Sequence, residues 1–426
     1  MASTGGEGSS ASAGARGATP GTAELGGTTW AAPGPAGDTL VVSDLHLGSA
    51  TGGDLLRAST DALDRFLDAL DGVGTLVIAG DLLELRHGPA RRILGRARPA
   101  LRAIGVRMGA HRRILLLAGN HDHALVRPWI DRRRLAGEEL GPTDAAAPAD
   151  VSPLAVAVAD ALGPAAVRIA YPAAWIVPPA GPEPVGASGR APASGRPAAT
   201  TAAGVASPAA CSGVLVTHGH HQDAIWRLPT IERLLAGVVA RTHGQTQDAT
   251  RTVDEFERLL RPAYGWIEGI AEYTERDRQA RSQRTSARIW DLLRDGRGVR
   301  GRAARIAVPA AVRAARRAGL GDLATRLDVD LLRREGLEGV ATVVHRWGLR
   351  PRHLISGHTH HAGPLAAALP DEWCTADGTH LWNPGAWVWE GTSLSGPIDD
   401  REHPYAPGGA VRIAADGTPR IVRVDL

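Results

Sequence analysis

The chain has 426 residues, of which 43% are hydrophobic, and its formal net charge at pH 7 is +3. This length allows one large core or two smaller ones, and so small a net charge is no reason by itself to expect nucleic-acid binding. The two cysteines, Cys211 and Cys374, are too few and too far apart for a disulfide framework or a cysteine-based zinc site.

The chain begins with small and polar residues. Residues 1–36 are mostly Gly, Ala, Ser, Thr and Pro, which predicts a disordered tail before one domain over residues 37–426. The N-terminus has no basic segment followed by an apolar one, and no run of about 18 apolar residues occurs. We therefore expect a cytoplasmic protein without a transmembrane segment.

Five short apolar runs each end in polar residues. They are TLVVSDLHLG (39–48), TLVIAGDLLEL (75–85), ILLLAGNHDHAL (114–125), GVLVTHGHHQDA (213–224) and HLISGHTHHAG (353–363). Their aliphatic beginnings are typical of buried strands. Helical periodicity over 55–70 and 90–105 separates the first three runs, so the order of elements predicts a layered α/β fold. In such folds the reactive groups gather at the carboxyl ends of the strands.

Two segments are expected to interrupt this pattern. Residues 178–210 have the composition of the tail and predict a low-complexity insertion. Residues 225–350 have several helical patterns and no convincing strand, so we interpret them as a helical cap insertion. Residues 409–426 predict a terminal hairpin with its turn at Asp416-Gly417.

Part of the expected cap is rich in arginine. Between Arg276 and Arg317 there are 13 Arg and three Asp, a local excess of +10. Guanidinium groups bind phosphate, and a basic amphipathic face can lie on anionic lipid head groups, so peripheral membrane contact is one expectation. The alternative is a solvated helix face.

The polar residues that follow the five runs combine carboxylate, imidazole and amide groups. They are Asp44, His46, Asp81, Asn120, His121, His218, His358 and His360. These donors suit Mn²⁺, Fe²⁺ or Zn²⁺. They are too many for one tetrahedral ion and about the right number for two ions that share a carboxylate, an arrangement that promotes phosphoryl displacement. Each residue also has a structural alternative, such as helix capping by Asp or a turn at Asn.

The blocks SDLHLG, GDLLEL, GNHDHA, THGHH and GHTHH, in this order, resemble the signature blocks of the calcineurin-like metallophosphoesterase family. The segment NPGAW (383–387) is similar to a loop that follows the last histidine block in many members. The resemblance implies a four-layer α/β/β/α sandwich with a helical cap. It also implies a phosphoesterase in which a metal-bound hydroxide attacks phosphorus, with two divalent ions, Mn²⁺ before Fe²⁺ or Zn²⁺.

The resemblance also implies a role for each residue. One ion would be held by Asp44, His46 and His360. The second would be held by Asn120, His218 and His358. Asp81 would bridge the two ions, and His121, oriented by Asp122, would stand near the phosphate as proton donor or transition-state stabiliser.

Departures from the family pattern narrow the substrate. GDLLEL lacks the Arg of the GDxVDRG block and GNHD replaces GNHE, which disfavours a phosphoprotein phosphatase. The chain is more similar to the UDP-2,3-diacylglucosamine pyrophosphohydrolase branch, although that branch usually has Arg where His121 stands. A phosphorylated small-molecule or lipid-linked substrate is expected. The alternatives are a DNA-repair-type nuclease, which would bind nucleic acid, and a non-catalytic binding module on the same fold.

Overall fold

The computed structural model describes residues 37–176, 213–273, 299–325 and 329–426, the last apart from positions 367, 390, 391, 394, 395, 399 and 401. The predicted tail and the predicted low-complexity insertion lie outside the described residues, as do residues 274–298 of the Arg-rich segment. The side chains of residues 299–306 are also outside the description.

Ten strands form one continuous mixed sheet in the order β12-β11-β1-β2-β3-β5-β6-β7-β8, with β4 paired to β5. The strands are β1 (Asp38–Val42), β2 (Val73–Ala79), β3 (Arg113–Leu117), β4 (Thr143–Ala146), β5 (Ala166–Ile176), β6 (Val214–Thr217), β7 (His353–Ser356), β8 (His380–Trp382), β11 (Gly409–Ile413) and β12 (Pro419–Arg423). A separate short pair comprises β9 (Thr392–Ser393) and β10 (Gly396–Pro397). β11 and β12 are antiparallel, which confirms the predicted terminal hairpin.

The long strand β5 joins two groups of parallel strands. Strands β1, β2, β3 and the first half of β5 run parallel, and so do β6, β7 and β8. β3 ends at Leu117 opposite Ala170, whereas β6, antiparallel to β5, ends at Thr217 opposite Ala173. The carboxyl ends of the two groups therefore meet near the middle of β5.

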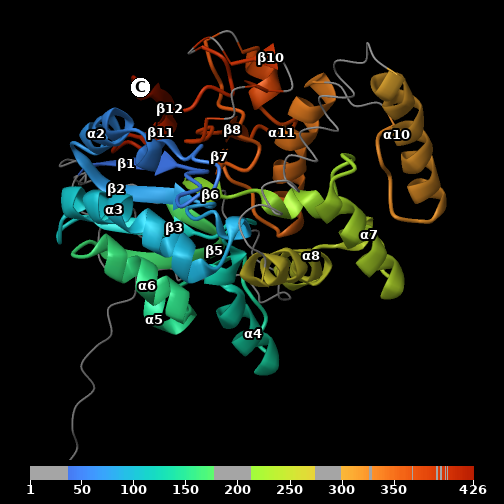
Figure 1. The fold of residues 1–426 in the computed structure, drawn as a ribbon, viewed down its shortest axis with the longest axis horizontal. Coiled ribbons are helices and arrows are strands. Elements are labelled where there is room, and N and C mark those ends of the chain that lie inside the picture. The colour runs from blue at the N-terminus through green and yellow to red at the C-terminus, as the bar shows by residue number, and fades with distance from the viewer. Residues whose placement is uncertain are drawn as a thin grey trace, which may run out of the picture.

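The described helices are arranged around the sheet, with α10 standing apart from it (Figure 1). They are α1 (Leu55–Ala58), α2 (Thr60–Ala69), α3 (Ala90–Met108), α4 (Arg127–Leu135), α5 (Pro148–Val151), α6 (Pro153–Leu162), α7 (Ile231–Thr242), α8 (Val253–Tyr273), α10 (Val299–Arg317) and α11 (Val329–Arg346). The helix predicted over 55–70 is broken at Ser59, which has extended backbone and caps α2 by accepting a hydrogen bond from the Ala62 N–H. Such caps satisfy backbone donors that a helix start leaves unpaired.

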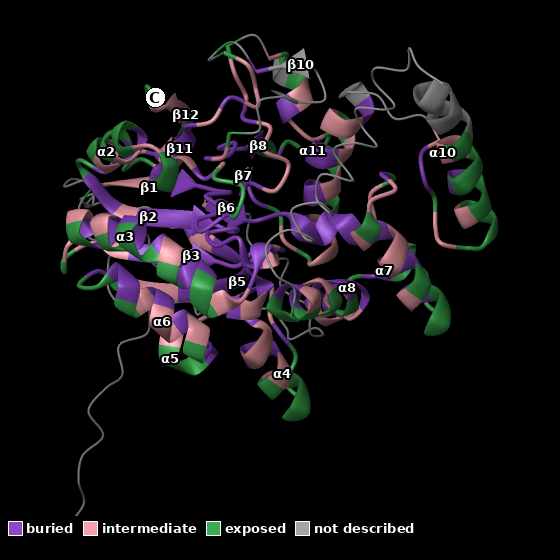
Figure 2. Cartoon of the chain, viewed as in Figure 1, coloured by how far each residue is buried: buried purple, intermediate pink, exposed green. Residues whose placement is uncertain are grey.

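Alternation along the strands divides the core. Leu40, Leu76 and Ile114 face a cluster that includes residues of α2, α3 and α6. Their neighbours in the chain, such as Val77, face a second cluster that includes residues of β6 and β7. α11 packs with Val344 on the other face of β6 and β7. Figure 2 shows this buried interior inside helices whose outer sides are exposed. The expected α/β class is confirmed.

The described residues between 225 and 350 form helices and no strand. α11 belongs to the packing of the sheet, while α7 and α8 pack on each other through Ala236, Phe256 and Leu260. Where the domain and its insertions begin and end stays a prediction. In the part of the chain that the structure describes, no helix combines the length and the apolar character needed to cross a membrane.

Candidate metal centre

The predicted ligands lie where the strands end. Asp44 and His46 follow β1, Asp81 follows β2, Asn120 follows β3, His218 follows β6, and His358 and His360 follow β7. We call these seven residues the strand-end centre. Because the two parallel groups meet at the middle of β5, their terminal loops converge on one place.

The backbone of the centre is strained. Among the residues that the structure describes, five non-glycine residues have positive φ, and all five are predicted ligands: Asp44 (56°), His46 (44°), Asp81 (52°), His358 (69°) and His360 (58°). A side chain in this left-handed region costs about 1–3 kcal/mol and persists only where the surrounding structure imposes it. Such strain gathers at functional sites, so this pattern supports a functional reading of the centre.

Two glycines of the motif blocks allow this packing. A Cβ on Gly80, whose φ is +94°, would lie 2.3 Å from Nδ1 of His218. A Cβ on Gly119 would lie 2.1 Å from Oδ1 of Asp81. Glycine is required here because the ligand side chains lie directly against the backbone of the neighbouring strand ends.

Asp44, His46 and His360 form one compact group that could hold a metal ion. His360 Nε2 lies 3.2 Å from Asp44 Oδ1 and 3.4 Å from His46 Nε2. Asp44 Oδ1 is buried and has no hydrogen-bond partner among the described residues. A buried carboxylate oxygen facing two imidazole nitrogens fits a cation, which would satisfy all three atoms at once.

Asp81 lies between this group and the next. Its Oδ2 is 3.7 Å from His46 Nε2 and 3.3 Å from His218 Nε2. Asn120 Oδ1 lies 3.1 Å from the same His218 nitrogen. Asp44, Asp81 and His218 form a second group that could hold a metal ion. One carboxylate oxygen thus faces two histidines that the family resemblance would assign to different ions.

The second nitrogens of two histidines are already bonded. His46 Nδ1 lies 2.9 Å from Glu84 Oε2, and His218 Nδ1 lies 2.9 Å from the Ala79 carbonyl oxygen. Because a carboxylate and a carbonyl only accept, both Nδ1 atoms must donate, which leaves Nε2 of each ring for a cation. Metal-binding histidines in proteins are usually oriented in this way.

His358 lies beside this arrangement and makes different contacts. Its Nε2 is 2.8 Å from Asp223 Oδ1, and its ring is 5.2 Å from the His218 ring and stacks on Trp226. Its backbone N–H donates to Asp44 Oδ2 at 3.0 Å. Asp223 therefore engages Nε2, and no group of described residues that could hold a metal ion includes His358. Asp223 was not singled out from the sequence, although it lies in the THGHHQDA block.

Glu84 is a further residue that the sequence did not assign. Its carboxylate accepts from His121 Nδ1 at 2.9 Å as well as from His46. Burial and the charge of Arg86 lower the pKa of His121 to about 4. Arg86 itself donates to the Asn120 carbonyl oxygen at 3.2 Å and to Glu232 Oε1 at 3.1 Å. In the sequence, the signal for this residue was an acidic side chain in an otherwise apolar stretch, three residues after Asp81.

Asp122 makes contacts other than the expected one. Its two oxygens accept from the backbone N–H groups of Gly119 (2.7 Å) and Leu83 (3.2 Å). Burial and the nearby charge of Asp81 raise the pKa of Asp122 to about 7. The Asp122 side chain therefore connects two loops that carry predicted ligands. The Nδ1 of His121 donates its hydrogen bond to Glu84 instead.

The charges of the centre attract one another strongly. Although burial favours the neutral acid, the charges of His360 and His218 hold the pKa of Asp44 well below its usual range. Although burial opposes it, the charges of Asp81 and Asp44 raise the pKa of His218 to about 9. Carboxylates that draw protons onto buried imidazoles would also draw divalent cations, which displace those protons on binding.

The NPGAW segment braces the centre. The backbone N–H of Trp387 donates to the Asp44 carbonyl oxygen at 3.0 Å. Asn383 Nδ2 donates to the Gly357 carbonyl oxygen at 3.1 Å. These bonds hold the strand-end loops of β1 and β7 from a third segment of chain.

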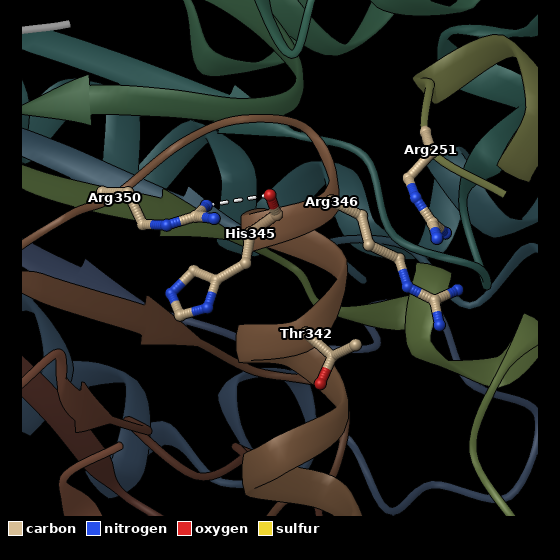
Figure 3. Close-up of a pocket in the computed structure, with 5 residues that line it drawn as sticks. All are labelled: Arg251, Thr342, His345, Arg346 and Arg350. Carbon is tan, nitrogen blue, oxygen red and sulfur yellow. Dashed lines mark hydrogen bonds between the residues drawn. The ribbon is translucent and has the colours of Figure 1, made fainter. Parts of the chain in front are cut away.

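A separate cavity of about 350 Å³ lies on α11. It is lined by Arg251, Thr342, His345, Arg346 and Arg350 (Figure 3). None of these residues belongs to the strand-end centre. Arg350 donates to the His345 carbonyl oxygen at 2.8 Å, so part of this positive charge already has a protein partner.

Comparisons with known proteins leave the family open. No protein-family model matches the chain, and no curated protein matches it. The metallophosphoesterase resemblance therefore rests on the five sequence blocks alone. What the structure adds is the convergence of those blocks into buried groups that could hold metal ions.

Proposed function

We propose that this protein is a two-metal phosphoesterase of the calcineurin-like type, acting on a phosphodiester, pyrophosphate or phosphomonoester. The position of Asp81 Oδ2, 3.7 Å from His46 Nε2 and 3.3 Å from His218 Nε2, carries the proposal because a shared carboxylate is what two adjacent cations require. Two such cations, when bound, activate a water molecule and neutralise charge on the phosphoryl group.

The ligands divide into two sets. One cation would be held by Asp44, His46 and His360. The other would be held by Asn120, His218 and His358. Asp81 would contact both. Mn²⁺ is the first expectation for this mixture of oxygen and nitrogen donors, with Fe²⁺ and Zn²⁺ as alternatives.

His121 and Arg86 would serve the substrate. Since Glu84 accepts the Nδ1 proton of His121 and the pKa of this ring is lowered to about 4, Nε2 would be unprotonated near neutral pH and would accept a proton or a hydrogen bond. Arg86 is close enough for its charge to act on His121, and its guanidinium group can pair with phosphate oxygens. Glu232 on α7 holds Arg86 in place.

We also propose that the curved sheet is the central pair of layers in a four-layer α/β/β/α sandwich. The cluster between β1–β3 and β6–β7 supports this, because it is covered by α3 and α6 on one side and by α11 on the other. The strand-end centre would then lie at one end of both inner layers.

For the substrate, we propose a phosphorylated small molecule or a lipid-linked phosphate, hydrolysed in the cytoplasm or at the inner membrane surface. The Arg-rich segment supports the lipid version by its charge in the sequence. A non-catalytic module is disfavoured because such proteins lose ligands, whereas all seven ligand positions here are occupied by residues that suit a metal.

Hydrolysis of an aryl phosphodiester in the presence of Mn²⁺ tests the proposal. Asp81→Ala should lower kcat/KM at least about 1000-fold, because the bridging carboxylate supports several kcal/mol of transition-state stabilisation. Asp61→Asn is the matched control, since Asp61 is exposed and pairs with Arg65 on the surface of α2. Equal activity of wild type and Asp81→Ala would end the metal mechanism. Degradation of DNA in preference to small esters would favour the nuclease.

A further inference from the structure

A second set of histidines lies beneath α8, apart from the strand-end centre. It consists of His123 in η2 (His123–Leu125), Tyr171 in β5, His220 and His221 in η3 (His220–Ala224), and Glu257 in α8. We call these five residues the α8 cluster. Their relative exposures are 0–1%, so five polar side chains from four elements meet with no access to solvent.

The side chains of the α8 cluster converge on one carboxylate. Glu257 Oε2 lies 3.0 Å from His123 Nε2, and Oε1 lies 3.1 Å from His221 Nε2. Tyr171 donates its hydroxyl proton to Glu257 Oε1. His220 Nε2 lies 3.1 Å from the same hydroxyl oxygen. His220, His221 and Glu257 thus form one compact group that could hold a metal ion, and His123 contacts the other oxygen of the carboxylate.

Glu257 supplies the one carboxylate among the five residues of this buried group. Although burial favours the neutral acid, the charge and hydrogen bond of His123 hold the pKa of Glu257 well below its usual range. A fully buried carboxylate is costly unless a positive charge compensates it. Neutral imidazole and ionised carboxylate are also the forms that bind metal.

We propose that the α8 cluster binds one further divalent cation, of the Zn²⁺ class, through His220, His221 and Glu257, with His123 as an adjacent fourth donor. The donor atoms of the first three residues lie within 4.8 Å of one another. Imidazole nitrogen and carboxylate oxygen both bind Zn²⁺, and four protein donors without solvent access would complete its tetrahedral coordination. The ion would fasten α8 to η3 and to η2.

This ion is distinct from those of the strand-end centre, since the two sets share no ligand. They are close neighbours, because the His218 and His220 rings are 5.4 Å apart. The inference does not depend on the proposed activity, and metal content tests it in a protein that has lost the strand-end centre.

The experiment uses the full chain with Asp44→Ala and Asp81→Ala combined, purified with Zn²⁺ and dialysed before elemental analysis. This protein should retain about one equivalent of zinc, the content of one closed site. Adding Glu257→Gln should remove it. His353→Asn is the matched control, because His353 stacks on His380 outside both sites and its loss should leave the zinc in place.

Folding is checked by circular dichroism, and a second measurement avoids reliance on Glu257→Gln. Co²⁺ loaded into the Asp44→Ala/Asp81→Ala protein should give the strong visible absorption of a four-coordinate site. A folded double variant that holds neither zinc nor cobalt would overturn the proposal. The α8 cluster would then be a buried hydrogen-bond network without a metal ion.

Discussion

The strand-end centre is built on five residues with positive φ, whereas none of the five residues in the α8 cluster has one. The two sites also differ in access. In the strand-end centre the side chain of His360 is 21% exposed, and that of neighbouring His121 is 19% exposed. The side chains of His123 and Glu257 in the α8 cluster are completely buried.

The surroundings of the rings differ as well. In the strand-end centre the second nitrogen of His46 or His218 donates to a carboxylate or a carbonyl. In the α8 cluster, Nδ1 of His123, His220 and His221 has no described partner. The partly exposed strand-end centre thus combines a strained backbone with rings oriented by hydrogen bonds from Nδ1. Among the described residues, the fully buried α8 cluster has neither feature. This contrast supports the proposed chemistry at the first site and the proposed structural role at the second.

The close packing of the strand-end centre can be broken with one methyl group. Gly119→Ala would place a Cβ 2.1 Å from Asp81 Oδ1, so the bridging carboxylate must move. Since a displacement of about 1 Å in a reacting group can cost 10²-fold, we expect kcat/KM to fall by about 100-fold or more. Steady-state kinetics with the aryl phosphodiester measures this.

Gly265→Ala is the control for that variant. Gly265 lies in α8, and no heavy atom of the described residues lies within 4 Å of the position that an added methyl group would take, so alanine fits. Replacing a helix-interior glycine should stabilise the fold by about 0.5–1 kcal/mol and leave activity unchanged. Similar activity in the two alanine variants would contradict the tight packing of the centre.

The orientation of the rings can be weakened more gently. Glu84→Gln keeps the size of the side chain but removes the charge that holds both His46 and His121. Loss of such an orienting partner typically costs about 10–100-fold in metal affinity or activity, so we expect kcat to fall in that range and more Mn²⁺ to be needed. The exposed Glu138→Gln should behave as wild type. A Glu84→Gln protein with unchanged Mn²⁺ dependence would remove Glu84 from the site.

His353, which lies outside both sites, is expected to have the smallest effect, on the pH dependence of stability. Burial and the charge of His380 lower the pKa of His353 to about 4 from its ordinary value near 6.5. The unfolded chain therefore binds the extra proton first, so this group costs stability as the pH falls from about 6.5 to 4 and has no further effect below that. The midpoint of thermal unfolding should fall slightly less over this window in His353→Asn than in wild type. Parallel curves would contradict the shift.

The gathering of these polar residues at the strand ends could be predicted because each of them follows closely after an apolar run. The runs at 39–48 and 75–85 mark their strands, and the polar residues after them could only lie at the strand ends. The strand β5 was not predicted, since Pro172 interrupts its apolar pattern. The break at Ser59 was missed as well, because helical spacing continues across it.

The contacts between distant segments could not be predicted. Tyr171 and Glu257 are 86 residues apart and meet only because α8 folds back toward the middle of β5. Asp223 pairs with His358 across 135 residues. Periodicity describes one element at a time, so it assigns a side chain to a face and does not say what packs against that face.

The passage of β5 through both groups of strands has a consequence for tolerance to change. β3 ends opposite Ala170 and β6 ends opposite Ala173, so the number of residues between these two positions of β5 fixes the distance between the loop after β3 and the loop after β6. Helices and surface segments can be lengthened or replaced without altering this distance between the two loops. Inserting a single amino acid between Ala170 and Ala173 would rotate one half of the ligand set away from the other.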